Sequence, residues 1–166
     1  MSQCNGFLPI EPLSAKVLIL GTMPSVESLN QAFYYAHPRN AFWPIMQKLL
    51  NRNLASDDEK THALQEAGIF LWDVLEACHR QGSLDSAIQQ PQANDFTWIF
   101  AKHPHLKTVI FNGKAAESLF KKQVLAKQTL PQDLHFMTLP STSPANARLS
   151  FEDKYLLWQE KLAELL

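Results

Sequence analysis

Side chains that can bind ligands or take part in catalysis are concentrated in four short stretches of this chain. Residues 34–44 combine four aromatic side chains with a His, an Arg and an Asn. Residues 72–73 are Trp-Asp, residues 112–114 are Asn-Gly-Lys, and residues 139–144 are Leu-Pro-Ser-Thr-Ser-Pro. An amide can orient water, an ionised carboxylate accepts hydrogen bonds, and hydroxyl groups suit phosphate oxygens. These stretches are the candidates for a functional site.

Each stretch also has a purely structural interpretation. Aromatic clusters usually belong to a core, so residues 34–44 could be an irregular loop with Asn40 as an ordinary turn residue. Asp73 could cap a helix or pair with Arg80, and we weigh this equally with a role in binding. By sequence, Asn112 fits a cap of the following helix better than an anion site. The Ser/Thr/Pro turn on its own needs no ligand.

Several reaction classes are disfavoured because their motifs are missing. Residues 113–114, Gly-Lys, lack the upstream glycine and the following Ser or Thr of a nucleotide-binding P-loop. Ser141 and Ser143 do not lie in the Gly-x-Ser-x-Gly turn of esterases. Cys4 and Cys78 have neither the number nor the spacing of a disulfide framework or a metal site, so we expect buried, unreactive thiols. No metal ion and no cofactor is expected.

Length and composition predict one ordinary globular domain over residues 1–166. The chain has 166 residues, of which 46% are hydrophobic and 19% are charged. This is the size of one domain and leaves no room for a second core. No apolar run approaches the ~20 residues of a membrane span, and residues 1–6 lack the pattern of a signal peptide, so we expect a cytoplasmic protein. With a net charge of -1, any nucleic acid must be bound through a local positive field. If DNA is the partner, the basic residues that would have to share one face are Arg39, Arg80, Lys102, Lys107, Lys114 and Arg148.

Hydrophobic patterning predicts strands separated by helices. Short aliphatic runs that end at turn residues indicate strands at 16–21, 69–72, 107–111 and 134–139. Helical periodicity, with Gly68 and Ser150 as capping residues, indicates helices at about 41–50, 57–67, 95–102, 113–125 and 150–165. This alternation requires crossover connections, so the predicted fold class is α/β with a mainly parallel sheet and helices on both faces.

The candidate stretches follow the predicted strands. In a parallel sheet, ligands bind beyond the carboxyl ends of the strands. The segments at those ends are 21–25, 72–73, 112–113 and 140–144. The aromatic stretch follows the turn of the first strand and should lie over the same edge. The sequence therefore predicts a single site at this edge of the sheet.

Four sequence motifs resemble those of the uracil-DNA glycosylase superfamily. They are the Gly-x-x-Pro turn at 21–24, His-Pro-Arg-Asn-Ala-Phe-Trp at 37–43, Gly-Ile-Phe-Leu-Trp-Asp-Val at 68–74 and Leu-Pro-Ser-Thr-Ser-Pro at 139–144. The combination is most similar to the DNA-deoxyinosine, or hypoxanthine-DNA, glycosylase branch, and next to the mismatch-specific uracil/thymine glycosylases. The resemblance covers about residues 16–160. It implies a three-layer α/β/α fold with a central four-stranded parallel sheet.

The resemblance implies an enzyme of base excision repair whose partner is DNA containing a deaminated base. Such an enzyme holds a flipped base and directs water at the anomeric carbon, with hypoxanthine as the first choice of base. No motif marks Lys114 as a lyase nucleophile, so we expect hydrolysis alone. A monomer without an obligatory protein partner is expected. The alternatives are a mismatch-specific uracil/thymine glycosylase and a catalytically silent module that binds damaged DNA.

The resemblance also implies roles for individual residues. In many relatives the water is held two places after the first glycine, where this chain has Met23, whose thioether cannot orient water. The resemblance instead points to Asn40 as the catalytic residue, with Phe42 stacking on the base and Tyr35 as a second wall. Asp73 stands where uracil-specific relatives have an Asn; it could accept the N1–H of hypoxanthine or act as a general base. The residues expected to bind the base are Met23, Tyr35, Phe42, Trp72, Asp73 and Asn112.

The fourth motif resembles a turn that grips the phosphates of the damaged strand. Some relatives carry a His there that stabilises the departing base, but residues 139–148 contain none. That role would fall to backbone donors or to His37. The residues expected to contact DNA are Thr22, Pro24, Ser25, Ser141, Thr142, Ser143, Asn146 and Arg148.

Overall fold

The central element of the computed structural model is a four-stranded sheet in which every neighbouring pair is parallel. Its strand order is β3-β2-β6-β7. The strands are β2 (Val17–Gly21), β3 (Ile69–Asp73), β6 (Thr108–Asn112) and β7 (His135–Leu139). All four begin and end within one residue of the predicted ranges. The structure describes residues 2–166. Met1 lies outside the described residues. It is the first residue of the expected domain and of the segment in which a signal peptide was looked for.

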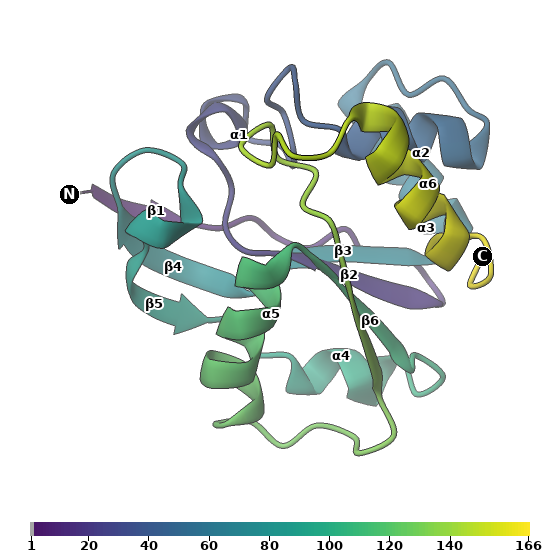
Figure 1. The fold of residues 1–166 in the computed structure, drawn as a ribbon. Coiled ribbons are helices and arrows are strands. Elements are labelled where there is room, and N and C mark those ends of the chain that lie inside the picture. Colours follow the sequence, from purple (N-terminus) through teal and green to yellow (C-terminus); the bar gives the residue numbers. More distant parts are fainter. Residues whose placement is uncertain (1) are drawn as a thin grey trace.

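Helices cover both faces of the sheet and complete the predicted three-layer α/β/α fold. α2, α3 and α6 lie on one face, and α4 and α5 lie on the other (Figure 1). α5 continues into one π-helical turn, η2. The bounds are α2 (Phe42–Leu50), α3 (Asp57–Ala67), α4 (Thr97–Lys102), α5 (Lys114–Phe120), η2 (Lys121–Leu125) and α6 (Phe151–Leu162).

Two of the predicted helix boundaries are confirmed in detail. Gly68 ends α3 in the left-handed conformation at φ 79°, which a residue with a Cβ adopts only with strain. Ser150 begins α6 with a capping box, in which its hydroxyl accepts from the Asp153 N–H and the Asp153 carboxylate accepts from the Ser150 N–H. In residues 2–166, no helix combines the length and the apolar character needed to cross a bilayer.

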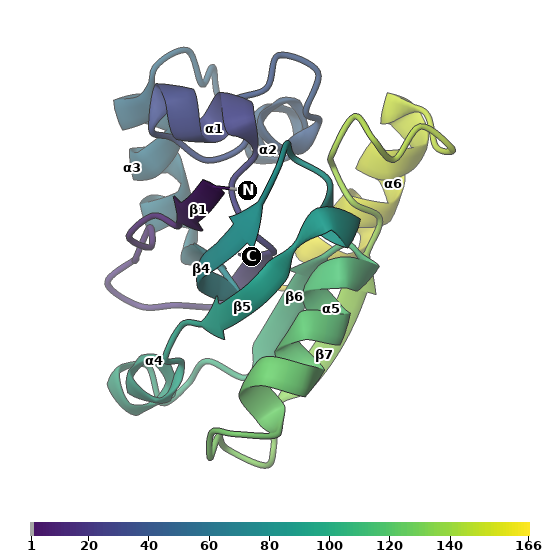
Figure 2. The ribbon, with the colours of Figure 1, turned by 90° about the vertical axis from the view of Figure 1, so that its left-hand side faces the viewer.

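A second, smaller sheet was not predicted. It is antiparallel with the strand order β1-β4-β5, and it lies beyond the carboxyl end of β3 (Figure 2). Its strands are β1 (Ser2–Asn5), β4 (Leu75–Arg80) and β5 (Gln89–Ala93). The two cysteines face each other across it, because Cys4 pairs with Cys78 in the β1–β4 register. Helix α1 (Val26–Gln31) and the short 3₁₀-helix η1 (Asp85–Ala87) were also not predicted.

Candidate active site

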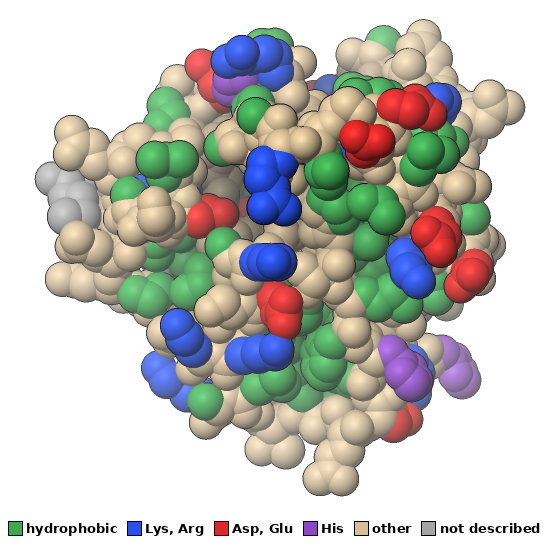
Figure 3. All heavy atoms as spheres, in the orientation of Figure 1, with side chains coloured by type: hydrophobic (Ala, Val, Ile, Leu, Met, Phe, Trp, Pro, Cys, Tyr) green, Lys and Arg blue, Asp and Glu red, His purple; other side chains and the backbone are tan. Residues whose placement is uncertain are grey.

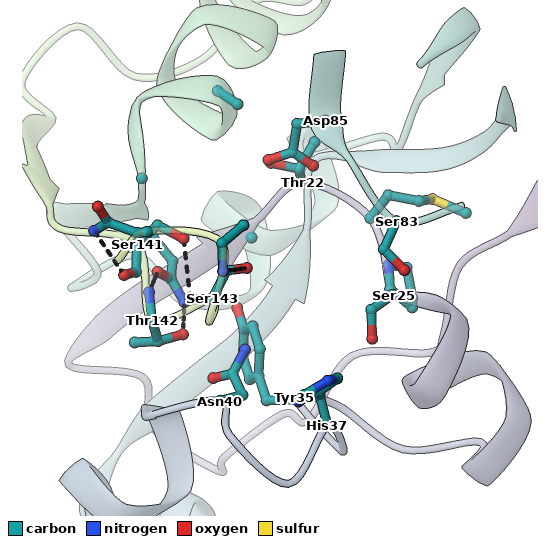
Figure 4. Close-up of a pocket in the computed structure, with 18 of the residues that line it drawn as sticks. Thr22, Ser25, Tyr35, His37, Asn40, Ser83, Asp85, Ser141, Thr142 and Ser143 are labelled. Carbon is teal, nitrogen blue, oxygen red and sulfur yellow. Dashed lines mark hydrogen bonds between the residues drawn. The ribbon is translucent and has the colours of Figure 1, made fainter. Parts of the chain in front are cut away.

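A pocket of about 540 Å³ lies where the sequence predicted it, at the carboxyl ends of the central strands. Figure 4 shows four sides: Asn40, Tyr35 and His37 on one, Thr22 and Asp85 opposite them, Ser25 and Ser83 on a third, and the turn of Ser141 to Ser143 on the last. The predicted site residues that line it are Thr22, Met23, Pro24, Ser25, Tyr35, Asn40, Asp73, Asn112, Ser141, Thr142, Ser143 and Asn146. Twelve side chains spread over 125 positions of the sequence thus reach one cavity.

Asn40 combines a structural contact with a place in the pocket wall. Its Oδ1 accepts a hydrogen bond from the N–H of Phe42, the first residue of α2, at 2.9 Å, although the N-cap position itself is occupied by Ala41. The next residue, Ala41, donates its N–H to the Thr142 carbonyl at 2.9 Å, which joins this loop to the turn after β7. The oxygen has a second lone pair, and the amide NH₂ has two donors. The same side chain can therefore hold its own loop in place and still bind a water molecule or a ligand.

The floor of the pocket lies over Gly21, where two polar side chains meet. A Cβ atom at Gly21 would come within 2.5 Å of Asp73 Oδ1 and 2.6 Å of Tyr35 Oη. The ring of Tyr35 is stacked on that of Phe42, with centroids 4.4 Å apart, and its backbone has φ 52°. The absence of a side chain at Gly21 is what allows a phenol and a carboxylate to converge there.

Both polar groups on the floor are buried without a hydrogen bond of normal geometry. Among the described residues, neither Tyr35 Oη nor Asp73 Oδ2 has a hydrogen-bond partner that meets normal geometry. Tyr35 Oη does lie beside the Asn112 side chain. Burial raises the pKa of Asp73 to about 7; the nearby Asp85 carboxylate adds to this rise and the Arg80 guanidinium opposes it. Burial and the charge of Asp73 raise the pKa of Tyr35, so it stays a neutral phenol that can donate. Unpaired buried groups of this kind are costly unless a ligand satisfies them.

Replacing Asp73 with Asn is expected to make the folded protein more stable at alkaline pH and to change little near pH 4. Because the pKa of the folded state is raised from 3.8 to about 7, the wild-type protein loses stability as the pH rises through that interval. One pKa unit corresponds to about 1.4 kcal/mol, so the gain of Asp73→Asn at pH 9 should be on the order of a few kcal/mol. Urea unfolding at pH 4 and pH 9 measures it.

Asp95→Asn is the matched control for that experiment. Asp95 is an exposed carboxylate whose pKa is lowered by hydrogen bonds from Thr97, so its replacement should give no gain at alkaline pH. Equal stabilities of the wild-type protein and Asp73→Asn at pH 9 would show that the carboxylate is not penalised by burial.

Asn112 braces the turn after β7. Its Nδ2 donates to Thr142 Oγ1 and its Oδ1 accepts from the Thr142 N–H, both at 2.9 Å. The predicted capping of α5 by Asn112 is wrong, because Gly113 occupies the N-cap position and α5 has no side-chain cap. The amide instead finds a partner 30 residues away along the chain, which no local pattern could indicate.

The turn from Ser141 to Ser143 is held from behind by α6. The Trp158 indole donates to the Pro140 carbonyl at 2.9 Å, and Lys154 Nζ donates to the Ser143 carbonyl at 3.2 Å. Ser141 and Ser143 line the pocket, and their hydroxyl oxygens accept from the Ser143 and Ala145 N–H groups. A rigid turn that presents hydroxyls and backbone N–H groups is suited to oxygen atoms of a phosphate.

One side of the pocket, made by residues 83–86 between β4 and β5, was missed by sequence analysis. Asp85 Oδ2 accepts from Thr22 Oγ1 at 3.4 Å, and burial of its carboxyl group raises its pKa while the charge of Arg80 lowers it. Arg80 is only 2% exposed and donates from Nη2 to the Pro24 carbonyl. The buried arginine thus fixes the Gly-x-x-Pro turn from the side of the small sheet. Nothing in the local sequence distinguishes it from a surface arginine.

Three of the predicted site residues lie outside the pocket lining. Phe42 is completely buried behind Tyr35, and Arg148 is exposed but does not line the pocket. Trp72 is buried among Phe96 and Trp98, and its indole donates to the Phe7 carbonyl at 2.9 Å. Successive residues of a strand point to opposite faces, so Trp72 and Asp73 cannot both reach the same cavity.

The six basic residues considered in the sequence analysis do not all lie on one face. Arg80 is buried, while Lys102 and Lys107 lie near the amino end of β6, where they pair with Glu11 and Asp133. Figure 3 shows Lys and Arg side chains in a column over α5, whose residues Lys114 and Lys121 are basic. Of the six, only Lys114 lines the pocket. In residues 2–166, no three His, Cys, Asp or Glu side chains are grouped so as to hold a metal ion.

Comparisons with known proteins identify the family to which the chain is similar. Residues 8–162 match the family model of the uracil DNA glycosylase superfamily. The chain is 34% identical over 150 residues to the hypoxanthine DNA glycosylase of Methanosarcina acetivorans, covering 88% of this chain and 90% of that one. It is 36% identical over 112 residues to the hypoxanthine DNA glycosylase of Methanosarcina barkeri, covering 66% and 71%. The NMR structure of a candidate uracil DNA glycosylase from M. acetivorans superposes with a TM-score of 0.83 at 31% identity over 99% of both chains.

Proposed function

The chain belongs to the uracil-DNA glycosylase superfamily, and we propose that it is a monofunctional DNA glycosylase that removes a deaminated base, preferably hypoxanthine, by hydrolysis. The observation that carries this proposal is the pocket itself. It is of the size that takes a small ligand, and the Asn40 amide faces it from the side opposite Thr22 and Asp85. Its floor holds a buried phenol and a buried carboxylate that lack partners. Two chains named for hypoxanthine are similar over most of the chain.

The proposed reaction needs a positioned water and a stabilised leaving base. Cleavage of the N-glycosidic bond develops positive charge on the sugar and negative charge on the base. Asn40, through its second oxygen lone pair, orients the water that attacks the anomeric carbon. The water adds its oxygen to that carbon, the base leaves with the bonding electron pair, and the water gives up one proton while the base takes one up, so that the products are the neutral free base and an abasic site. No covalent intermediate with the protein is required.

The floor of the pocket matches the edge of a deaminated purine. Hypoxanthine presents an N1–H donor next to the O6 acceptor, whereas adenine presents an acceptor at N1 and a donor at position 6. In the proposed complex, the ionised Asp73 accepts N1–H and the neutral Tyr35 phenol donates to O6. Both contacts satisfy groups that are otherwise buried without partners.

His37 is suited to assist the departure of the base. Its Nδ1 accepts a hydrogen bond from the Arg39 N–H at 3.0 Å, so the neutral ring carries its proton on Nε2. His37 lines the pocket, and its Nε2–H is a donor for a base that is becoming anionic. Phe42 supports Tyr35 from behind, so direct stacking of the base on Phe42 would require Tyr35 to move.

A panel of damaged oligonucleotides tests the proposal. Single strands and duplexes that contain inosine, uracil, xanthine or a guanine–thymine mismatch are incubated with the protein and then treated with alkali. We expect alkali-dependent breaks, fastest at inosine and absent without alkali. Faster cleavage at uracil or at mismatched thymine would favour the mismatch-specific alternative. Binding without breaks at any lesion would favour a silent DNA-binding module.

A further inference from the structure

The two cysteines of the chain lie directly opposite each other in the small sheet, although they are far apart in the sequence. Cys4 of β1 and Cys78 of β4 are Cα partners in the antiparallel register. In such a pair the Cα atoms lie about 4.5 or 5.5 Å apart, and the two side chains leave the sheet on the same face. A disulfide spans a Cα separation of about 4.4 to 6.8 Å. The register therefore places the pair within the reach of a disulfide.

The side chains of the two cysteines are also in contact. The Cys78 thiol lies within hydrogen-bonding reach of Cys4, whose Sγ donates to the Arg80 carbonyl at 3.9 Å. Cys78 belongs to the hydrophobic core, and Cys4 packs against that core. Opposed Cβ atoms lie about 4.5 to 5.5 Å apart, whereas a disulfide holds them about 3.5 to 4.5 Å apart. A bond between the sulfur atoms thus requires the strands to approach each other by about 1 Å.

One thiol of the pair can be reached from solvent and the other is protected. Cys4 is half-buried on β1, which is an edge strand of the small sheet. Cys78 is 1% exposed on the central strand β4. Burial raises the pKa of the Cys78 thiol, the charge of Arg80 opposes this rise, and the contact with Cys4 adds to it. Because the thiolate is the reactive form, a reagent from solution meets Cys4 first, and Cys78 reacts only through Cys4.

We propose that Cys4 and Cys78 form a thiol–disulfide exchange site that takes low-molecular-weight disulfides such as oxidised glutathione. The Cys4 thiolate attacks one sulfur of the small disulfide, whose S–S bond breaks and releases the first thiol. Cys78 then loses its proton and attacks Cys4 Sγ, which expels the second thiol. Both cysteines are oxidised, the small disulfide is reduced to two thiols, and these take up the two protons that the protein gives up.

The new bond would join the first strand covalently to the support of the pocket. β1 has four residues, and β4 ends at Arg80, which donates to the Pro24 carbonyl in the pocket wall. A cross-link between residues 4 and 78 restricts the unfolded chain and so stabilises the folded protein. The approach of the strands stores strain, which makes the bond easier for thiols to reduce. The site therefore takes part in reversible exchange and does not depend on the reaction in the pocket.

The experiment equilibrates the full-length wild-type protein with oxidised glutathione and measures its intact mass and its titratable thiols. We expect the protein to lose two hydrogen atoms and both thiols, and to migrate as a single chain on a non-reducing gel. The melting temperature should rise by about 5 to 15 °C. Dithiothreitol should reverse all three changes.

Two variants separate the roles of the two thiols. Cys78→Ala should keep one glutathionyl group on Cys4, because the second step is blocked. Cys4→Ser, the matched control, should take up no glutathione and should gain no stability, because Cys78 is buried. The mass of the wild-type protein decides the matter even if a variant fails to fold.

Three results would overturn the exchange site. They are a wild-type protein that keeps both thiols, one that forms only disulfides between chains or a lasting mixed disulfide, and a Cys4→Ser variant that reacts as readily as the wild type. None of these measurements uses DNA, so they leave the proposed function untouched, and a failure of the lesion panel would leave the exchange site untouched.

Discussion

Replacing Asn40 with Ala is expected to lower the single-turnover rate of base excision by about 100- to 1000-fold. The substitution removes the amide that faces the pocket. At the position that the resemblance gives as the water-binding one in many relatives, this chain has Met23, whose sulfur cannot orient water. Alkali-dependent strand breaks on an inosine oligonucleotide, with the protein in excess over DNA, measure the chemical step directly.

The change in the free energy of unfolding distinguishes the structural role of Asn40 from its proposed catalytic role. Loss of the hydrogen bond from the Phe42 N–H should cost about 1 kcal/mol, which is small beside the expected fall in rate. Asn40→Asp is the matched control for stability, because a carboxylate can keep the hydrogen bond from the Phe42 N–H. If Asn40→Ala and Asn40→Asp both excised inosine at the wild-type rate, another residue would have to hold the water.

Replacing Gly21 with Ala is expected to lower excision by about 100-fold or more, because displacements of about 1 Å in a site have effects of that size. The new Cβ would lie 2.5 Å from Asp73 Oδ1 and 2.6 Å from Tyr35 Oη, so both groups must move. Tyr35 is backed by the buried Phe42, and Asp73 is the last residue of a buried strand, so neither can move without cost. The measured quantity is kcat/KM on an inosine oligonucleotide.

Gly82→Ala is the control for the effect at Gly21. Gly82 has φ 76°, so alanine is strained there, but no atom lies within 4 Å of the added Cβ. We expect it to lower the melting temperature and to leave excision largely intact. Gly21 lies outside the left-handed region, so Gly21→Ala should fold. Full activity in a folded Gly21→Ala protein would mean that the floor of the pocket takes no part in binding the base.

The central sheet could be predicted from sequence because its strands carry their own signal. β2, β3 and β6 are short aliphatic or aromatic runs, buried at every position, that stop at turn residues. The small sheet gave no such signal. β4 follows β3 after one residue, β5 carries a proline and three glutamines, and β1 pairs with β4 from more than 70 residues away. Pairing at that distance is decided by tertiary packing and not by local preference.

The site was predictable in its location but not in the direction of its side chains. Knowing that strand ends meet at one edge was enough to gather Asn40, Asp73 and Ser141. Whether an aromatic residue faces the cavity depends on helix phase and packing, which is why Phe42 lies behind Tyr35. Arg80 lies in the interior, where it donates to the Pro24 carbonyl on another loop. Its burial could not be predicted, because sequence patterning treats arginine as a surface residue.

Because β1 pairs with β4, the way in which the protein is truncated or tagged near residues 2–5 should affect its behaviour in solution. Residues 2–5 supply the backbone partners of one edge of β4, and β4 leads into residues 83–86, which line the pocket. Trimming these residues would expose that edge to pairing with other molecules. An affinity tag is therefore better fused after Leu166, beyond α6, and preparations shortened at the amino end should be checked for aggregation before their excision rates are compared.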